Sequence, residues 1–136
     1  MLEIKNADLV QTKSFLYDLK LKPQLSRHRT KLIKLLDDKI KDLTESSTEL
    51  IKQYAKKDDN DNPIINGNLI EFDNATNRIA FEKEDAILAN EVSHINLEEY
   101  PNVYDAIKQA LSELDIELDK EKANTFELLC ELFNVE

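Results

Sequence analysis

Apolar residues recur every three or four positions over most of the chain, which is the pattern of amphipathic helices. Leu2 and Ile4 precede the first of these patterns and predict a short strand. Asn6 is then expected to cap a helix that carries the apolar residues from Leu9 to Leu19 and ends before Pro23.

The longest apolar stripe begins after Ser26 and continues to Tyr54. Its members are Leu32, Ile33, Leu36, Ile40, Leu43, Leu50, Ile51 and Tyr54. Ser46 and Glu49 fit a capping box, so a break between two helices is possible there. We expect one continuous or merely kinked helix.

The period changes in the middle of the chain. Ile64–Ile65, the pair Asn66–Gly67 and Leu69–Phe72 predict a strand, a tight turn and a second strand. After a turn at residues 73–77, Arg78–Phe81 is expected to add a third strand, which would complete a small antiparallel meander.

The last third returns to helical spacing. Residues 83–92 predict a short helix, and residues 93–97 predict either a strand at the sheet edge or a loop. Pro101 suits the first turn of a helix with the stripe Tyr104, Ile107, Leu111 and Leu114. Asp119 is expected to cap a final helix that buries Ala123, Phe126, Leu129, Cys130 and Phe133.

These elements predict an α+β fold, a mainly helical single domain over residues 1–136 with a small antiparallel sheet from the middle of the chain. Charge divides this domain into two halves. Residues 1–57 hold 13 basic and 8 acidic residues, whereas residues 58–136 hold 5 and 20. The boundary is the polar run Asp58–Pro63, which has the composition of a turn. We therefore expect a basic helical half and an acidic half made of a hairpin and helices.

Composition excludes several classes of protein. Gly67 is the only glycine, so the chain lacks the glycine-rich loops that cradle nucleotides and the elbow that presents a nucleophilic serine. The net charge of −10 opposes direct binding to nucleic acid or to anionic membranes. A lone Cys130, and no apolar run long enough to span a bilayer, indicate a cytoplasmic protein.

No metal or cofactor is expected. Asp58, Asn60 and Asn62 occupy the first three ligand positions of a calcium loop, but Pro63 replaces the required glycine and Leu69 replaces the bidentate glutamate. Zinc is disfavoured because Cys130, His28 and His94 are isolated from one another.

No catalytic residue is expected either. A nucleophilic site built from Cys130 and His94 is disfavoured because Cys130 lies between Glu127 and Glu131, whereas a reactive thiol needs an electropositive setting. Carboxylate pairs are too numerous for any one of them to be selected as an acid and base. We expect a protein that is not an enzyme.

The most specific feature is a basic segment, residues 20–41, with eight Lys and Arg against Asp37 and Asp38. Arg27, Lys31 and Lys34 would share one helix face at spacings of four and three. The candidate binding residues are Lys20, Lys22, Arg27, Arg29, Lys31 and Lys34. They either neutralise the acidic half within the fold, form a solvated helix face, or bind a partner, for which an acidic protein is favoured over nucleic acid.

The acidic half suggests a second hypothesis. Asp115, Glu117 and Asp119 alternate with apolar residues, so in an extended segment their carboxylates would repeat about every 6.8 Å on one face. Such a row can imitate a phosphate backbone and inhibit a host protein that binds nucleic acid. The alternative is a solvated acidic face that keeps the protein soluble.

Four short segments carry a resemblance to a known group of proteins. They are Leu19–Lys22 with Ser26–Lys31, then Tyr54–Asp58 leading into the hairpin, and the closing Phe126–Phe133. Together they resemble a family of small uncharacterised proteins of tailed phages and prophages in low-GC Gram-positive bacteria. The resemblance implies a phage gene product that acts through protein–protein contacts, as an accessory of late gene products or on a host protein. It implies no catalytic residues and no oligomeric state.

Overall fold

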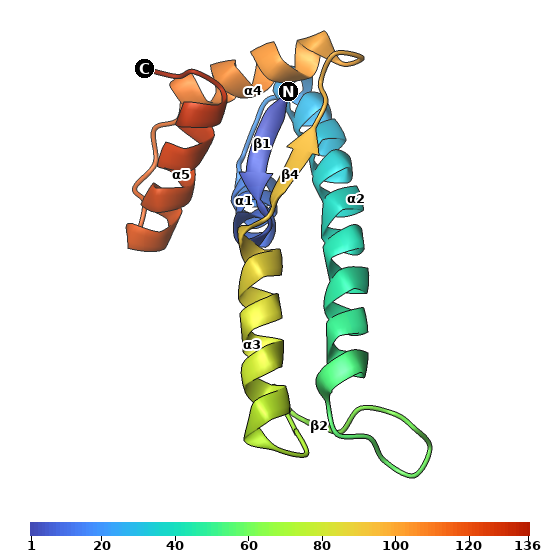
Figure 1. Cartoon of the computed structure of the whole chain (residues 1–136). Helices are drawn as coiled ribbons and strands as arrows, with labels where there is room; N and C mark the ends of the chain where they lie inside the picture. The colour runs from blue at the N-terminus through green and yellow to red at the C-terminus, as the bar shows by residue number, and fades with distance from the viewer. The chain divides into compact units, whose positions relative to one another are not determined.

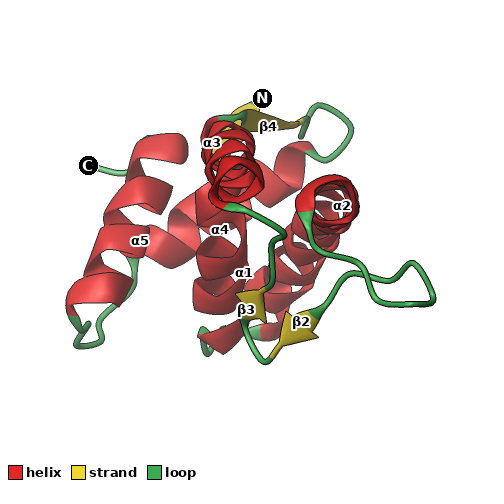
Figure 2. Cartoon of the chain, turned by 60° about the horizontal axis from the view of Figure 1, so that its bottom comes forward, coloured by secondary structure: helices red, strands yellow, loops and turns green.

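The computed structural model describes all 136 residues as a mainly helical α+β protein, and the α+β class is confirmed (Figure 2). Five helices account for most of the chain. They are α1 (Leu9–Asp18), α2 (Pro23–Tyr54), α3 (Ala75–Asn90), α4 (Pro101–Ser112) and α5 (Lys120–Leu132). The strands form two antiparallel pairs, β1 (Leu2–Lys5) with β4 (Val92–Ile95) and β2 (Ile65–Asn66) with β3 (Leu69–Ile70).

The chain forms two compact units. Unit 1 contains residues 1–40 and 92–136, and unit 2 contains residues 41–91. Helix α2 belongs to both, because it continues without interruption past Ile40. The charge of the sequence changes sign at residue 58, which lies inside unit 2. That residues 1–136 form a single domain stays a prediction.

The two-stranded sheet of unit 1 joins distant parts of the chain. Strand β1 pairs with β4 in a register that places Leu2 opposite Ile95 and Lys5 opposite Val92 (Figure 1). Leu2 and Ile4 are buried while Glu3 and Lys5 are exposed, as expected for a strand with one covered face. Residues 93–97 were expected to form either a strand at the sheet edge or a loop. The structure has a strand, β4, over Val92–Ile95, and it pairs with β1.

Unit 1 holds nearly all of the hydrophobic core. Helix α1 packs on α5, where the rings of Phe15 and Phe126 lie 6.2 Å apart, and α5 also packs on α4. Phe133, just beyond α5, is fully buried with its ring 5.2 Å from that of Tyr104. Ala55 is the only buried apolar residue that belongs to unit 2.

Unit 2 consists of the second half of α2, the polar turn, the β2–β3 hairpin and α3. The hairpin is confirmed, with its two-residue turn at Gly67–Asn68, one position later than expected. Gly67 adopts φ 64°, a left-handed conformation that glycine accepts without strain. Phe81 contacts two other aromatic rings, Tyr54 at 6.5 Å and Phe72 at 5.5 Å between centroids.

The expected third strand at Arg78–Phe81 is wrong, because these residues lie inside α3. Asn74 begins this helix by accepting a hydrogen bond from the backbone N–H of Asn77 at 2.8 Å. The apolar alternation that suggested a strand is short, and the residues that follow it are strong helix formers. The helix expected at residues 83–92 is the second half of α3, which ends at Asn90.

Three smaller expectations also differ from the structure. Asn6 does not cap the first helix; it begins a 3-10 turn, and its side-chain oxygen accepts a hydrogen bond from Ser93 Oγ at 2.5 Å. Helix α2 begins at Pro23, before Ser26, because a proline suits the first helical position. On α5, Ala123 is exposed and Thr125 is buried instead.

The remaining helices lie where they were expected, although Leu114 falls beyond the end of α4, and Phe126 and Cys130 on α5 are half-buried. Helix α2 runs through Ser46 and Glu49 without a break, α4 starts at Pro101, and Asp119 caps α5 by accepting from the N–H of Lys122 at 2.8 Å. None of the helices combines the length and apolar content that crossing a bilayer requires.

Candidate functional site

The six basic candidates lie around the start of α2 in unit 1, and the fold gives them different roles. Lys20 and Lys22 are exposed in the link between α1 and α2, and Arg27 and Lys34 are exposed on α2. None of the six forms an ion pair within 4.0 Å. Asp37, one of the two acids in this segment, pairs instead with Lys13 of α1 at 2.6 Å.

Arg29 belongs to the structure of unit 1. Its Nη1 donates to the carbonyl oxygens of Leu16, at 3.3 Å, and of Leu19, while Nη2 donates to Ser26 Oγ at 3.1 Å. The last carbonyls of a helix have no partner within the helix, so the guanidinium closes the end of α1. Arg29 is therefore not available to a partner.

Lys31 is also engaged within unit 1. Its Nζ lies 4.2 Å from the centroid of the Tyr100 ring, which is the geometry of a cation–π contact. The surface that remains open to a partner consists of Lys20, Lys22, Arg27 and Lys34, and we call these four residues the basic surface.

The acidic row lies between α4 and α5, in a segment that is neither helix nor strand. Asp115, Glu117 and Asp119 are all exposed, and the backbone of Asp119 is extended. Asp119, however, uses a side-chain oxygen to cap α5. Only Asp115 and Glu117 remain free of such a structural role.

Asp58 stabilises the polar turn. Its Oδ1 accepts hydrogen bonds from the N–H groups of Asn60, at 2.9 Å, and Asn62, at 3.0 Å. This arrangement turns the carboxylate toward the backbone of its own loop. No cluster of three His, Cys, Asp or Glu side chains has the arrangement of a metal site.

His94 and Cys130 are not brought together. His94 Nε2 lies 3.5 Å from Glu3 Oε1 across the β1–β4 pair, whereas Cys130 is half-buried on α5. Burial of the thiol, and to a lesser extent the nearby Glu127 carboxylate, raise the pKa of Cys130. A raised pKa lowers the thiolate fraction at neutral pH, which is unfavourable for a nucleophile.

Alkylation of Cys130 by iodoacetamide is therefore expected to be slower at pH 7.5 than alkylation of the urea-unfolded chain. Because the pKa of Cys130 is raised in the folded state, alkylation of the folded protein should still become faster with increasing pH in the range where the thiol of the unfolded chain is already deprotonated. Mass spectrometry of timed samples measures both rates, and Glu127→Gln should bring them closer. A folded rate equal to or above the unfolded rate would contradict the stated environment of the thiol.

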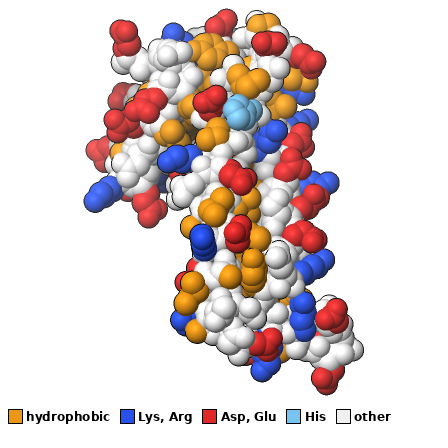
Figure 3. All heavy atoms as spheres, viewed as in Figure 1, with side chains coloured by type: hydrophobic (Ala, Val, Ile, Leu, Met, Phe, Trp, Pro, Cys, Tyr) orange, Lys and Arg blue, Asp and Glu red, His pale blue; other side chains and the backbone are white.

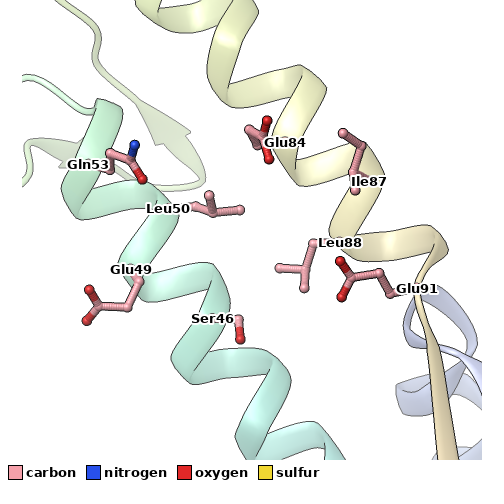
Figure 4. Close-up of a pocket in the computed structure, with 8 residues that line it drawn as sticks. All are labelled: Ser46, Glu49, Leu50, Gln53, Glu84, Ile87, Leu88 and Glu91. Carbon is pink, nitrogen blue, oxygen red and sulfur yellow. The ribbon is translucent and has the colours of Figure 1, made fainter.

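A groove in unit 2 was not predicted from the sequence. It lies between the second half of α2 and α3, has a volume of about 350 Å³, and is lined by Leu50, Leu88 and three glutamates (Figure 4). The sequence does not indicate the groove, because the apolar alternation at Arg78–Phe81 predicts a strand where the structure has α3. One signal in the sequence does point to a helix that faces another helix. On α2, a stripe recurs at alternating spacings of four and three residues, through Leu43, Ser47, Leu50 and Tyr54.

Comparisons of the chain with family models, with curated proteins and with solved structures returned no match. The resemblance to small phage proteins therefore stays a prediction.

Proposed function

We propose that this chain is a non-enzymatic, cytoplasmic protein that acts through protein–protein contacts and binds an acidic partner at the basic surface. The observation that carries this proposal is that Lys20, Lys22, Arg27 and Lys34 have no ion pair in a chain with a large excess of carboxylates. Exposed cations left without intramolecular partners can steer an acidic surface toward α2. A phage or prophage origin fits this proposal, but the proposal does not require it.

The net charge of the chain favours a protein partner over nucleic acid. A long polyanion such as duplex DNA is repelled by the net charge of the whole molecule, which is −10. A small acidic patch on a protein interacts mainly with the nearby cations, because more distant charges are screened by salt. The basic surface also lacks the interleaved aromatic side chains on which single-stranded bases stack.

Reversal of two cations tests this proposal. Lys22→Glu with Arg27→Glu is preferred to any variant of Arg29 or Lys31, because those two stabilise unit 1. The partner is captured by a photo-crosslinker placed at position 30, an exposed residue of α2 between Arg27 and Lys34, in cells that express the chain, and is then purified. The double variant should weaken its binding by about tenfold or more, mainly through slower association.

The matched control is Lys120→Glu with Lys122→Glu, which makes the same change in net charge on exposed residues of α5. The control should change the dissociation constant by less than about threefold. If both double variants weaken binding equally, or if the captured material is nucleic acid, the proposed function is wrong. Stopped-flow association rates at several salt concentrations measure the steering directly.

Mimicry of nucleic acid by the acidic row is the alternative function, and it has less support. The row is exposed and lies outside helices and strands, as that function requires. Because the Asp119 carboxylate caps α5, the row offers a partner two unengaged carboxylates, Asp115 and Glu117.

A further inference from the structure

The groove of unit 2 combines an apolar floor with an acidic rim. Leu50 of α2 and Leu88 of α3 point toward each other across it, and Ile87 lies on its α3 side (Figure 4). Glu49, Glu84 and Glu91 supply the carboxylates of the rim. All of these residues belong to unit 2.

The apolar side chains of unit 2 are incompletely covered. Helix α3 has no buried residue, and Ile79 and Ile87 on it are 59% and 47% exposed. Figure 3 shows hydrophobic side chains at the surface of α2 and α3, with Asp and Glu side chains beside them. An amphipathic helix normally covers its apolar stripe against another element, so this groove is suited to receive one more helix.

Charge selects the kind of helix that fits. Two cations lie near the rim, Lys52, 3.9 Å from Glu49, and Lys83, which lines a neighbouring hollow with Ile87 and Glu91. Neither of them pairs with Glu84 or Glu91, which have no ion-pair partner. A second copy of the chain seated symmetrically on the groove would place these glutamates near their own equivalents, and like charges facing each other oppose association. A helix with Lys and Arg beside its apolar stripe would complement the rim.

We propose that this groove binds an amphipathic, basic helix of a partner protein. Apolar side chains spaced at i, i+3, i+4 and i+7 would occupy the floor between Leu50 and Leu88, and the flanking cations would pair with Glu84 and Glu91. This site is separate from the basic surface. The basic surface binds an acidic partner, whereas the groove binds a basic helix.

The probe is a fluorescein-labelled synthetic helix of Leu and Lys, about 14 residues or four turns long, with Leu at the spacing above. Full-length protein should bind it saturably in a fluorescence anisotropy titration, and binding should shift the methyl resonances of Leu50, Ile87 and Leu88. A peptide with the same Lys residues but Ser in place of Leu should bind at least about tenfold more weakly, because it has no apolar anchor.

Two charge-reversal variants of α3 distinguish a specific groove from general attraction to an acidic chain. Glu84→Lys with Glu91→Lys reverses the rim and should weaken binding of the Leu/Lys peptide by about tenfold or more. Glu82→Lys with Asp85→Lys makes the same charge change on exposed residues of α3 that do not line the groove, and should weaken it by less than about threefold. Far-UV circular dichroism checks that both variants keep their helices.

Several outcomes would overturn this proposal. Equal weakening by the two variants, or equal binding of the Ser/Lys peptide, would mean that charge alone attracts the probe. A protein that sediments as a dimer, and whose Leu50 and Leu88 resonances move on dilution, would show that a second copy occupies the groove. The variant Lys22→Glu with Arg27→Glu should leave peptide binding unchanged, so failure here is distinct from failure of the proposed function.

Discussion

Replacement of Phe133 by alanine is expected to lower the free energy of unfolding of unit 1 by about 3–5 kcal/mol. The Phe133 side chain is fully buried, and its ring packs 5.2 Å from that of Tyr104. Removal of the ring takes away its transfer free energy and leaves a cavity that the surrounding helices fill only in part. Urea titration followed by amide hydrogen exchange in α4 and α5 measures the change.

Ile116→Ala is the control for this prediction. Ile116 is 57% exposed between α4 and α5, so its truncation should change the same free energy by no more than about 0.5 kcal/mol. A loss below about 1 kcal/mol for Phe133→Ala would mean that the C-terminal helix does not close the core as described.

Replacement of Arg29 by alanine is expected to cost about 1–3 kcal/mol of unfolding free energy. The variant removes the guanidinium donor to the carbonyl of Leu19, and one of two donors to the carbonyl of Leu16, which also accepts from the N–H of Leu19 at 3.3 Å. Arg29→Lys should recover only part of the loss, because one ammonium cannot reproduce the fork of a guanidinium. Chemical melts of the purified variants give the midpoints.

Arg27→Ala, two residues away on the exposed face of α2, should leave the midpoint nearly unchanged. If Arg27→Ala and Arg29→Ala were equally destabilising, the special role of Arg29 would be refuted. If neither variant changed the midpoint, Arg29 would return to the set of residues available to a partner.

The elements that the sequence predicted well are those with long, uninterrupted periodicity. Helix α2 has a regular stripe from Leu32 to Tyr54, so weak helix formers near Ser46 do not break it. Asp119 and Pro101 were informative because capping and first-turn preferences depend on local chemistry. By contrast, Ile79 and Phe81 alternate as in a strand, but a run of four residues is too short to be decisive, and the rest of α3 makes this segment a helix.

The candidate site was predicted only in part, because charge alone does not show which cation donates hydrogen bonds to backbone carbonyls within the fold. Arg29 carried a signal of its own, however. At 100° per residue it lies about 200° from Arg27 around α2, away from the face that Arg27 and Lys34 occupy. Predicting the groove requires knowing that α2 and α3 run side by side, and the apolar stripe of one helix does not show which other element covers it.

The pairing of β1 with β4 has a consequence for how the protein is made. Leu2 pairs with Ile95, so the first strand has no partner until the ribosome has synthesised the whole of unit 2. Residues 41–91 are a continuous segment and can acquire helical structure first. Until β4 has been synthesised, β1 has no partner strand and its apolar side chains are exposed to solvent. Because closing so long a loop costs entropy before the sheet and core of unit 1 can form, we expect unit 1 to form more slowly than the helices of unit 2.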